Sequence, residues 1–235
     1  MLIIVSEDEK FVKRKEELIA NYKRNGYLES EEIIRAFRTV PREKFIGSNP
    51  KRFAYLDRPL SISSNQTISA PHMVAMMVSK KCINLNVGDI CLEVGAGSGY
   101  HAAVIAEIVA PTGSDKSKWG HVYTIERIKK LVDFANENLR EAGYADRVTV
   151  IHADGSLGLP EKAPFDKISV AAAAPEIPPP LLEQLKPGGQ LVIPVGGKGY
   201  YQELIIAEKS TDGKISKRKM CGVAFVPLIG KHGYS

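Results

Sequence analysis

The sequence predicts an α/β fold with a doubly wound, mostly parallel sheet of about seven strands. From about residue 84 onward, short apolar runs alternate with segments of helical periodicity, which is the pattern of strands joined by helical crossovers. A glycine-rich segment at residues 93–99 follows the first apolar run, where such sheets bind their ligands. A Thr-Asp-Gly-Lys turn at residues 211–214 predicts that the last two strands form a C-terminal antiparallel hairpin.

Composition excludes several classes of protein. The chain has 235 residues, 44% of them hydrophobic and 25% charged, which excludes collagen-like, disordered and disulfide-scaffold proteins. The net charge is +5, but Lys and Arg are spread along the chain, so we expect no specific nucleic-acid partner. The three separated cysteines predict reduced, buried thiols in a cytoplasmic protein. Residues 1–5 do not resemble a signal peptide, and the longest apolar stretch, residues 170–174, is too short to enter a membrane.

The N-terminal region predicts helices and a covering segment. Residues 9–24 and 30–38 show helical periodicity, and Pro41 ends the second helix. Residues 45–70 are rich in Ser, Asn and Pro and predict a connection without regular structure, while residues 71–82 resume helical spacing. We therefore expect residues 1–83 to form a helical region that covers substrate and cofactor, and residues 84–235 to form the core.

The core alternates strand and helix. Helices are predicted at residues 100–110, from residue 128 to Gly143, and at residues 181–185. Strands are predicted at residues 90–94, 121–125, 148–152, 167–170, 190–195, 202–208 and, last, near 221–228.

The glycine-rich segment fits two familiar patterns poorly. A dinucleotide fingerprint starting at Gly95 needs a small residue where Tyr100 stands. A nucleophile elbow around Ser98 needs glycines where Ala96 and Tyr100 stand. Neither pattern therefore explains the segment.

An acid before the glycines favours a cationic ligand. Glu93 precedes Gly95, Gly97 and Gly99, and its carboxylate would repel a pyrophosphate but attract the ammonium and sulfonium of S-adenosyl-L-methionine. Glycines let a ligand approach the backbone, and the start of a helix suits the ligand's carboxylate. We predict that Glu93, Gly95, Ala96, Gly97 and Gly99 belong to an S-adenosylmethionine site, the alternative being a tight turn without a ligand.

Two further acids follow later strands. Glu126 ends the second predicted strand, where a carboxylate accepts the ribose hydroxyls of a nucleoside; the alternative is a solvated ion pair with Arg127. Asp154 and Gly155 follow the third strand, where the adenine edge would lie; the alternative is an Asp-Gly turn. We include all four residues in the predicted cofactor site.

No metal site is predicted. The five histidines are scattered without the spacing of metal ligands. Residues 196–198, Gly-Gly-Lys, fail the phosphate-loop pattern on both sides.

With these residues in view, the chain resembles the protein-L-isoaspartate (D-aspartate) O-methyltransferases from about residue 41 to residue 228. The segments that carry the resemblance are VPREKF at 40–45, QTISAPHM at 66–73, LEVGAGSGY at 92–100, APFD at 163–166, AAAPEIP at 172–178, LKPGG at 185–189 and FVPL at 225–228. The glycine loop and LKPGG occur in many methyltransferases, whereas TISAP is far more specific. The chain departs from the family in the N-terminal extension, the polar loop at residues 112–119 and the choice of Glu at position 93.

The resemblance implies an enzyme that methylates the α-carboxylate of L-isoaspartyl residues in damaged proteins, after which a succinimide forms and opens partly to aspartate. It places the Ser69 hydroxyl beside the methyl-transfer site as the catalytic group, and Gln66, Thr67, Ile68 and Ser69 over cofactor and substrate. The residues that it implies for substrate binding are Ser69, Ala70, Pro71, His72, Val226, Pro227 and Leu228. From the residues alone, Ser69 is also a candidate helix N-cap before Pro71.

The implied chemistry needs no strong base, because an α-carboxylate with a pKa of roughly 3.5 is already ionised at neutral pH. Alignment and exclusion of water would supply the catalysis. The alternatives are an RNA methyltransferase acting on tRNA, which would need more stacking aromatics than 7%, and an inactive cofactor-binding module. The oligomeric state stays open.

Overall fold

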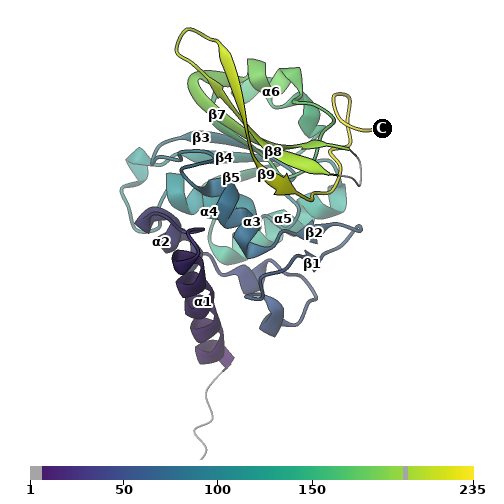
Figure 1. The fold of residues 1–235 in the computed structure, drawn as a ribbon. Helices are drawn as coiled ribbons and strands as arrows, with labels where there is room; N and C mark the ends of the chain where they lie inside the picture. The colour runs from purple at the N-terminus through teal and green to yellow at the C-terminus, as the bar shows by residue number, and fades with distance from the viewer. Residues whose placement is uncertain (1–6, 198–200) are drawn as a thin grey trace, which may run out of the picture.

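The computed structural model describes residues 7–197 and 201–235 (Figure 1). The apolar residues 1–5, interpreted above as not being a signal peptide, and Lys198 of the Gly-Gly-Lys segment lie outside the described residues. Within the described ranges, none of the helices combines the length and the apolar character that crossing a bilayer requires.

One seven-stranded sheet forms the centre of the molecule, in the order β5-β4-β3-β6-β7-β8-β9. Its strands are β3 (Ile90–Val94), β4 (His121–Glu126), β5 (Val148–His152), β6 (Phe165–Val170), β7 (Leu185–Gly196), β8 (Gln202–Lys209) and β9 (Ile215–Val223). Neighbours from β5 to β7 are parallel, while β7, β8 and β9 pair antiparallel. The predicted doubly wound sheet with a C-terminal hairpin is confirmed.

The order of the strands creates a switch point beside β3. The chain passes from β3 outward to β4 and β5, and then returns to the other side of β3 to form β6. The chain thus places β4 and β5 on one side of β3, and β6 and β7 on the other. Because the strand order reverses at β3, a crevice opens there at the carboxyl ends of the parallel strands. The segments that follow β3, β4, β5 and β6 meet there.

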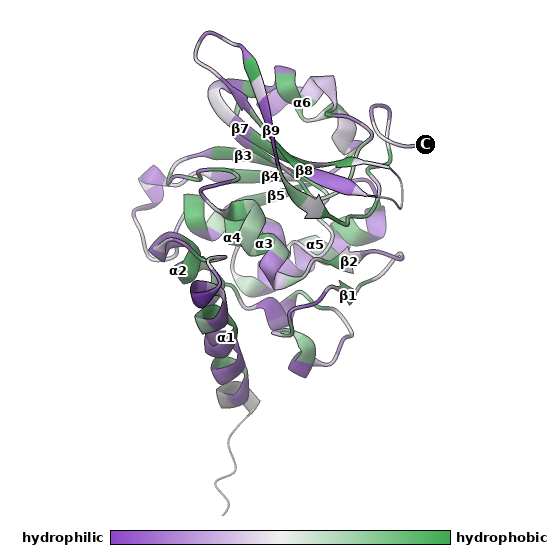
Figure 2. Ribbon diagram, in the orientation of Figure 1, coloured by the Kyte–Doolittle hydropathy of each residue, from purple (hydrophilic) through white to green (hydrophobic). Residues whose placement is uncertain are grey.

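Helices cover both faces of the sheet. Figure 1 shows α4 (Tyr100–Val109) and α5 (Lys129–Ala142) on one face and the short α6 (Pro179–Glu183) near β7 on the other. Every residue of α4 is buried, whereas α5 buries only one stripe and ends at Gly143, which has φ +82°. The parallel strands are mainly apolar (Figure 2), with exceptions such as Glu93 and Lys167, as expected for strands that helices cover on both faces.

The N-terminal region packs on this core through apolar helix faces. Helix α1 (Glu7–Arg24) projects from the body (Figure 1) and buries Ile19 and Tyr22 near its end. Helix α2 (Glu31–Thr39) buries Ile33, Ile34, Ala36 and Phe37 and packs on α4. One cluster of buried side chains includes residues of α1, α2 and α4. The division of the chain at residue 83 stays a prediction.

Several predicted elements differ from the structure. The helix predicted at residues 181–185 is Pro179–Glu183, and the strand predicted at residues 190–195 begins at Leu185. The segment predicted as an irregular connection contains a small antiparallel pair, β1 (Leu60–Ser61) with β2 (Thr67–Ile68). Helix α3 (Pro71–Val78) ends before residue 82, because Ser79 turns extended at ψ 152°. The last strand is Ile215–Val223 and not residues 221–228. It begins earlier because Ile215, directly after the turn at residues 211–214, already pairs with Lys209.

Residues 224–228, predicted as strand, leave the sheet and cross to Ala173. There Ala173 N–H donates to Val226 O over 2.8 Å, and Leu228 N–H donates to Ala173 O over 2.7 Å. The cysteines are free thiols, as predicted, with Cys82 and Cys91 buried and Cys221 only partly so.

Candidate active site

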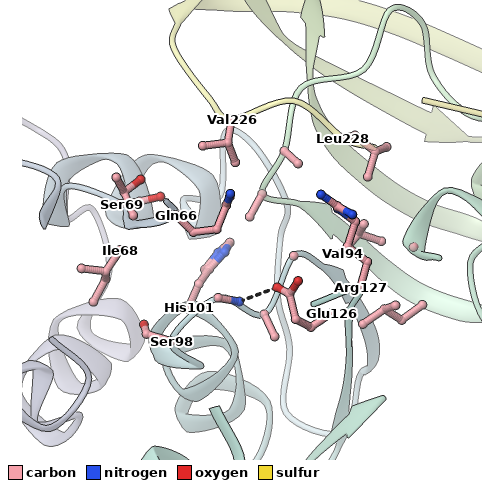
Figure 3. A pocket seen from close by; sticks show the side chains of 18 of the residues that line it. Gln66, Ile68, Ser69, Val94, Ser98, His101, Glu126, Arg127, Val226 and Leu228 are labelled. Atoms are coloured by element: carbon pink, nitrogen blue, oxygen red, sulfur yellow. Dashed lines mark hydrogen bonds between the residues drawn. The ribbon is translucent and has the colours of Figure 1, made fainter. Parts of the chain in front are cut away.

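A pocket open to solvent lies at the switch point of the sheet (Figure 3). Most of the residues predicted from the sequence line it: Gln66, Thr67, Ile68, Ser69, Gly95, Ala96, Gly97, Glu126, Arg127, Gly155, Val226, Pro227 and Leu228. Five separate segments of the chain therefore converge on one cavity.

The glycine loop needs left-handed backbone at three positions. Gly95, Gly97 and Gly99 have φ values of +99°, +53° and +85°, a region that other residues seldom adopt. Gly95 N–H donates to Ile125 O at the end of β4 over 2.8 Å. Gly99 does not line the pocket, because it faces α5, where an added Cβ would lie 3.1 Å from Cγ of Leu139.

Glu126 joins the end of β4 to the glycine loop. Its Oε2 accepts from Gly97 N–H over 3.1 Å, the bond that Figure 3 draws as a dashed line, and its Oε1 accepts from Ile128 N–H over 2.9 Å. The residue is only 7% exposed and lines the pocket. The predicted alternative, a solvated ion pair with Arg127, is wrong, since two backbone amides hold the carboxylate.

Glu93 lies beneath the pocket instead of lining it. It is fully buried and accepts a hydrogen bond from the Thr124 hydroxyl on β4. Its Oε1 lies 3.3 Å from Nδ1 of His101. Neither that oxygen nor Nε2 of His101 has a hydrogen-bond partner among the described residues. Of these two atoms, only Nε2 of His101 belongs to a residue that lines the pocket, so a bound ligand can supply its missing partner.

His101 is a lining residue that the sequence reasoning did not find. It stands in the first turn of α4, and its ring points into the pocket (Figure 3). A helix that begins directly after a ligand-binding loop presents its first turn to the ligand. The place of His101 in the first turn after the glycine loop could therefore have predicted it as a lining residue.

Asp154 lies outside the pocket, although Gly155 beside it is a lining residue. Its carboxylate accepts from Ser156 N–H over 2.9 Å and from Lys231 N–H over 2.8 Å. Burial alone would raise the pKa of Asp154, but these hydrogen bonds outweigh it and hold the pKa below its usual value. The structure thus shows the turn-capping role that was the alternative, and a contact with adenine stays a prediction.

Ser69 follows β2 and precedes α3. The residue that caps α3 is Ala70, and no side chain caps that helix. The N-cap interpretation of Ser69 is therefore wrong. Its side chain faces the pocket beside Gln66 (Figure 3).

A second cleft, also open to solvent, adjoins the pocket. Of the residues predicted to bind substrate, Ser69, Ala70, His72 and Val226 line it, while Pro71 lines neither cavity. Both cavities share the residues Thr67, Ser69, Ala171 and Val226. The remaining walls are mainly apolar: Pro59, Met73, Tyr201, Gly222, Val223, Ala224 and Phe225.

The sequence model of the protein-L-isoaspartate(D-aspartate) O-methyltransferases (PCMT) matches residues 13–233 of the chain. The chain belongs to this family. Among its relatives, the protein-L-isoaspartate O-methyltransferase of Hyperthermus butylicus is 54% identical, with 97% of this chain and 93% of the relative covered. That of Methanopyrus kandleri is 48% identical, with 98% of each covered.

Solved structures of the family have the same fold. A putative protein-L-isoaspartate O-methyltransferase from Plasmodium falciparum, solved with S-adenosyl-L-homocysteine, is 32% identical and superposes with a TM-score of 0.78. The match covers 92% of this chain and 98% of that one. The resemblance drawn from the sequence is confirmed.

The pocket suits the methyl donor of this family. Two carboxylates, Glu126 in the wall and Glu93 beneath it, favour the cationic ammonium and sulfonium of S-adenosylmethionine over a pyrophosphate. The unpartnered Nε2 of His101, which lines the pocket, is consistent with a hydrogen-bond partner arriving with the cofactor. Across residues 7–197 and 201–235, no cluster of side chains could hold a metal ion.

Proposed function

We propose that this chain transfers a methyl group from S-adenosyl-L-methionine to the α-carboxylate of L-isoaspartyl residues in damaged proteins, with Ser69 at the point of transfer. Family membership supports the reaction. One observation carries the site: Ser69 lines both the glycine-loop pocket and the neighbouring cleft. A group at that junction meets the cofactor from one side and the substrate from the other.

The glycine-loop pocket is the proposed cofactor site. Glu126 would accept the ribose hydroxyls, since its carboxylate is already oriented by Gly97 and Ile128. The loop from Gly95 to Gly97 would receive the methionine part, and Gly155 would lie near adenine. Residues 66–69 would cover the cofactor from the side opposite Glu126.

The adjoining cleft is the proposed substrate site. Its apolar walls suit the side chains that flank an isoaspartyl residue in an unfolded segment. His72 would lie beside the substrate backbone, held by Asp57 through a 2.7 Å contact between His72 Nδ1 and Asp57 Oδ1. Val226 would separate substrate from cofactor together with Ser69, while Pro227 and Leu228 belong to the cofactor side.

Catalysis would consist of positioning. S-adenosylmethionine supplies an electrophilic methyl group on a sulfonium. The substrate carboxylate is ionised at neutral pH, so no residue has to remove a proton. The Ser69 hydroxyl would donate to one carboxylate oxygen and leave the other free to form the bond to the methyl carbon. The bond between that carbon and the sulfonium would break at the same time, its electron pair staying on sulfur, so that S-adenosyl-L-homocysteine leaves while the walls exclude water.

Transfer of labelled methyl groups tests this function. We expect label on a peptide with one L-isoaspartyl residue, and none on the same peptide with normal aspartate. Unmodified tRNA serves as a third substrate, because the mildly basic chain left an RNA methyltransferase open. Labelling of tRNA in place of the isoaspartyl peptide would contradict the proposal.

Two broader assignments accompany this function. The free thiols of Cys82 and Cys91 are buried, which supports a location in the reducing cytoplasm. The region up to residue 83 contributes one wall of each cavity through residues 66–73, which supports its assignment as the covering region.

A further inference from the structure

A fully buried arginine lies behind the Ser69 segment. Arg42 is 0% exposed, and its Nε donates to Ala54 O over 2.8 Å. Its Nη2 donates to Ser69 O, also over 2.8 Å. The guanidinium carbon lies 4.7 Å from the centre of the Tyr100 ring, at the start of α4. One side chain therefore contacts the Ser69 backbone and the helix that follows the glycine loop.

The cost of this burial indicates a specific role. The groups that interact with its charge are the phenols of Tyr22, Tyr55 and Tyr100, and desolvation lowers the pKa of Arg42. Nη1 has no hydrogen-bond partner among the described residues. Burying a cation without a paired carboxylate is expensive, and apolar packing would stabilise the fold as well or better. The arginine adds a planar, rigid guanidinium group, which fixes the carbonyls of Ala54 and Ser69 relative to each other.

We propose that Arg42 is a positioning residue for methyl transfer, acting through Ser69. The inference rests on the proposed function of Ser69. Arg42 holds the carbonyl of Ser69 and so fixes where the hydroxyl of the same residue points. Its stacking on Tyr100 sets that backbone at a constant distance from the glycine loop, where the cofactor would lie.

A second anchor holds the other end of the same segment. Asp57 Oδ1 lies 3.2 Å from His72 N–H and 2.7 Å from His72 Nδ1, and it also accepts from the Tyr22 hydroxyl of α1 over 2.5 Å. Residues 69–72 are therefore held at both ends. Both anchors come from the N-terminal region, which gives that region a role in the reaction beyond covering the cavities.

The chain supplies a matched control in Arg147. This arginine is 5% exposed, donates to Ala110 O over 2.7 Å and to Gly143 O over 3.0 Å, and stacks 4.5 Å from the centre of the Tyr144 ring. It lines neither the pocket nor the cleft. Arg42 and Arg147 thus share burial, carbonyl partners and stacking. They differ in what they hold, and Arg147 also lies 3.6 Å from Glu107 Oε2 and 3.3 Å from Asp146 Oδ1.

The experiment compares Arg42→Lys with Arg147→Lys. Lysine keeps the charge but loses the planar fork. For Arg42→Lys we expect kcat on an isoaspartyl peptide to fall about 10- to 100-fold, the scale of a misplaced positioning group. S-adenosylmethionine affinity should change less than about threefold. Arg147→Lys should lower the melting temperature and leave kcat unchanged.

Combination with Ser69→Ala shows whether Arg42 acts through Ser69. In the Ser69→Ala background, Arg42→Lys should lower kcat by less than about threefold, because the group that it positions is gone. Equal losses in both backgrounds, or an equal loss of kcat in Arg147→Lys, would overturn the inference. A normal kcat in Ser69→Ala alone would instead remove the proposed function of Ser69.

Asp57→Ala keeps the inference testable if Arg42→Lys does not fold. Asp57 is partly exposed, so its removal releases His72, although it also leaves the hydroxyl of the buried Tyr22 without this partner. We expect kcat to fall several-fold at unchanged cofactor affinity. An unchanged kcat would show that the anchoring of residues 69–72 does not matter to the reaction, which overturns the role given to Arg42.

Discussion

The two sides of the site are built in different ways. The cofactor side follows β3 and β4, whose parallel ladder pairs Glu93 with Thr124 and places the glycine loop directly. The Ser69 side follows a strand of only two residues, Thr67–Ile68, and is held by the side chains of Arg42 and Asp57. Backbone pairing between strands specifies the first side, whereas hydrogen bonds from two side chains specify the second.

This difference predicts that substitutions on the two sides affect different properties, cofactor binding on one side and turnover on the other. A change on the cofactor side should remove binding while the fold persists, because the sheet forms without the ligand. A change on the Ser69 side should leave binding nearly intact and lower turnover. The following variants test this separation in order of expected effect.

Gly97→Val should abolish detectable cofactor binding. An added Cβ meets no protein atom closer than Ile62 Cδ1 at 3.8 Å, so the valine would occupy the pocket. The positive φ of +53° adds strain of about 1 to 3 kcal/mol. Calorimetric titration with S-adenosylmethionine measures the loss, and thermal unfolding should remain cooperative.

Gly113→Val is the control for strain alone. Gly113 has φ +80° with open space around it, and it lies away from the pocket. We expect the Gly113→Val variant to lose about as much stability as Gly97→Val and still to bind the cofactor. Normal binding by Gly97→Val would mean that the glycine loop is only a turn.

Ser69→Ala should lower turnover on an isoaspartyl peptide by about 10² to 10³, the effect of removing one preorganised donor. Cofactor affinity should change far less, because the backbone around Ser69 stays in place. The melting temperature should also stay close to that of the unaltered chain, since Ala70 and not Ser69 caps α3. Full turnover would contradict the catalytic assignment.

Glu126→Ala should weaken cofactor binding at least about tenfold, since hydrogen bonds to a charged group contribute about 1.5 to 3 kcal/mol each. Glu126→Gln should weaken it less, because one side-chain oxygen remains to accept from Gly97 or Ile128. Calorimetric titration of both variants with S-adenosylmethionine separates the contribution of the Glu126 charge from that of its hydrogen-bond geometry. Equal affinity in the alanine variant and the unaltered chain would refute the placement of the ribose.

Asp154→Ala should have the smallest effect on binding, below about threefold, because its carboxylate holds Ser156 and Lys231. Stability should change instead, and with pH. The pKa of Asp154 is lowered in the folded chain, so its contribution is present above the unfolded pKa of about 4 and disappears as pH falls below it. The difference in unfolding free energy between variant and parent should therefore shrink below about pH 4. A tenfold loss of S-adenosylmethionine affinity in Asp154→Ala would instead support a direct contact between Asp154 and the cofactor.

The sequence predicted the sheet well because buried parallel strands are continuous apolar runs, such as residues 90–94, and helical crossovers alternate with them. It misplaced the last strand because residues 224–228 are as apolar as a strand and only their pairing with Ala173 shows otherwise. Arg42 and His101 escaped notice for a related reason. A buried arginine and a pocket histidine have no periodicity, and only the tertiary structure shows their partners.

The wall at residues 226–229 has a consequence for how the enzyme is made. These residues line the pocket together with the glycine loop, yet the ribosome adds them after every other residue of the pocket. A nascent chain can fold its parallel strands early, but the pocket is complete only once translation has passed Ile229. Cofactor capture is thus coupled to late synthesis, and a ribosome-bound chain stalled before β9 should remain unable to methylate the proteins around it.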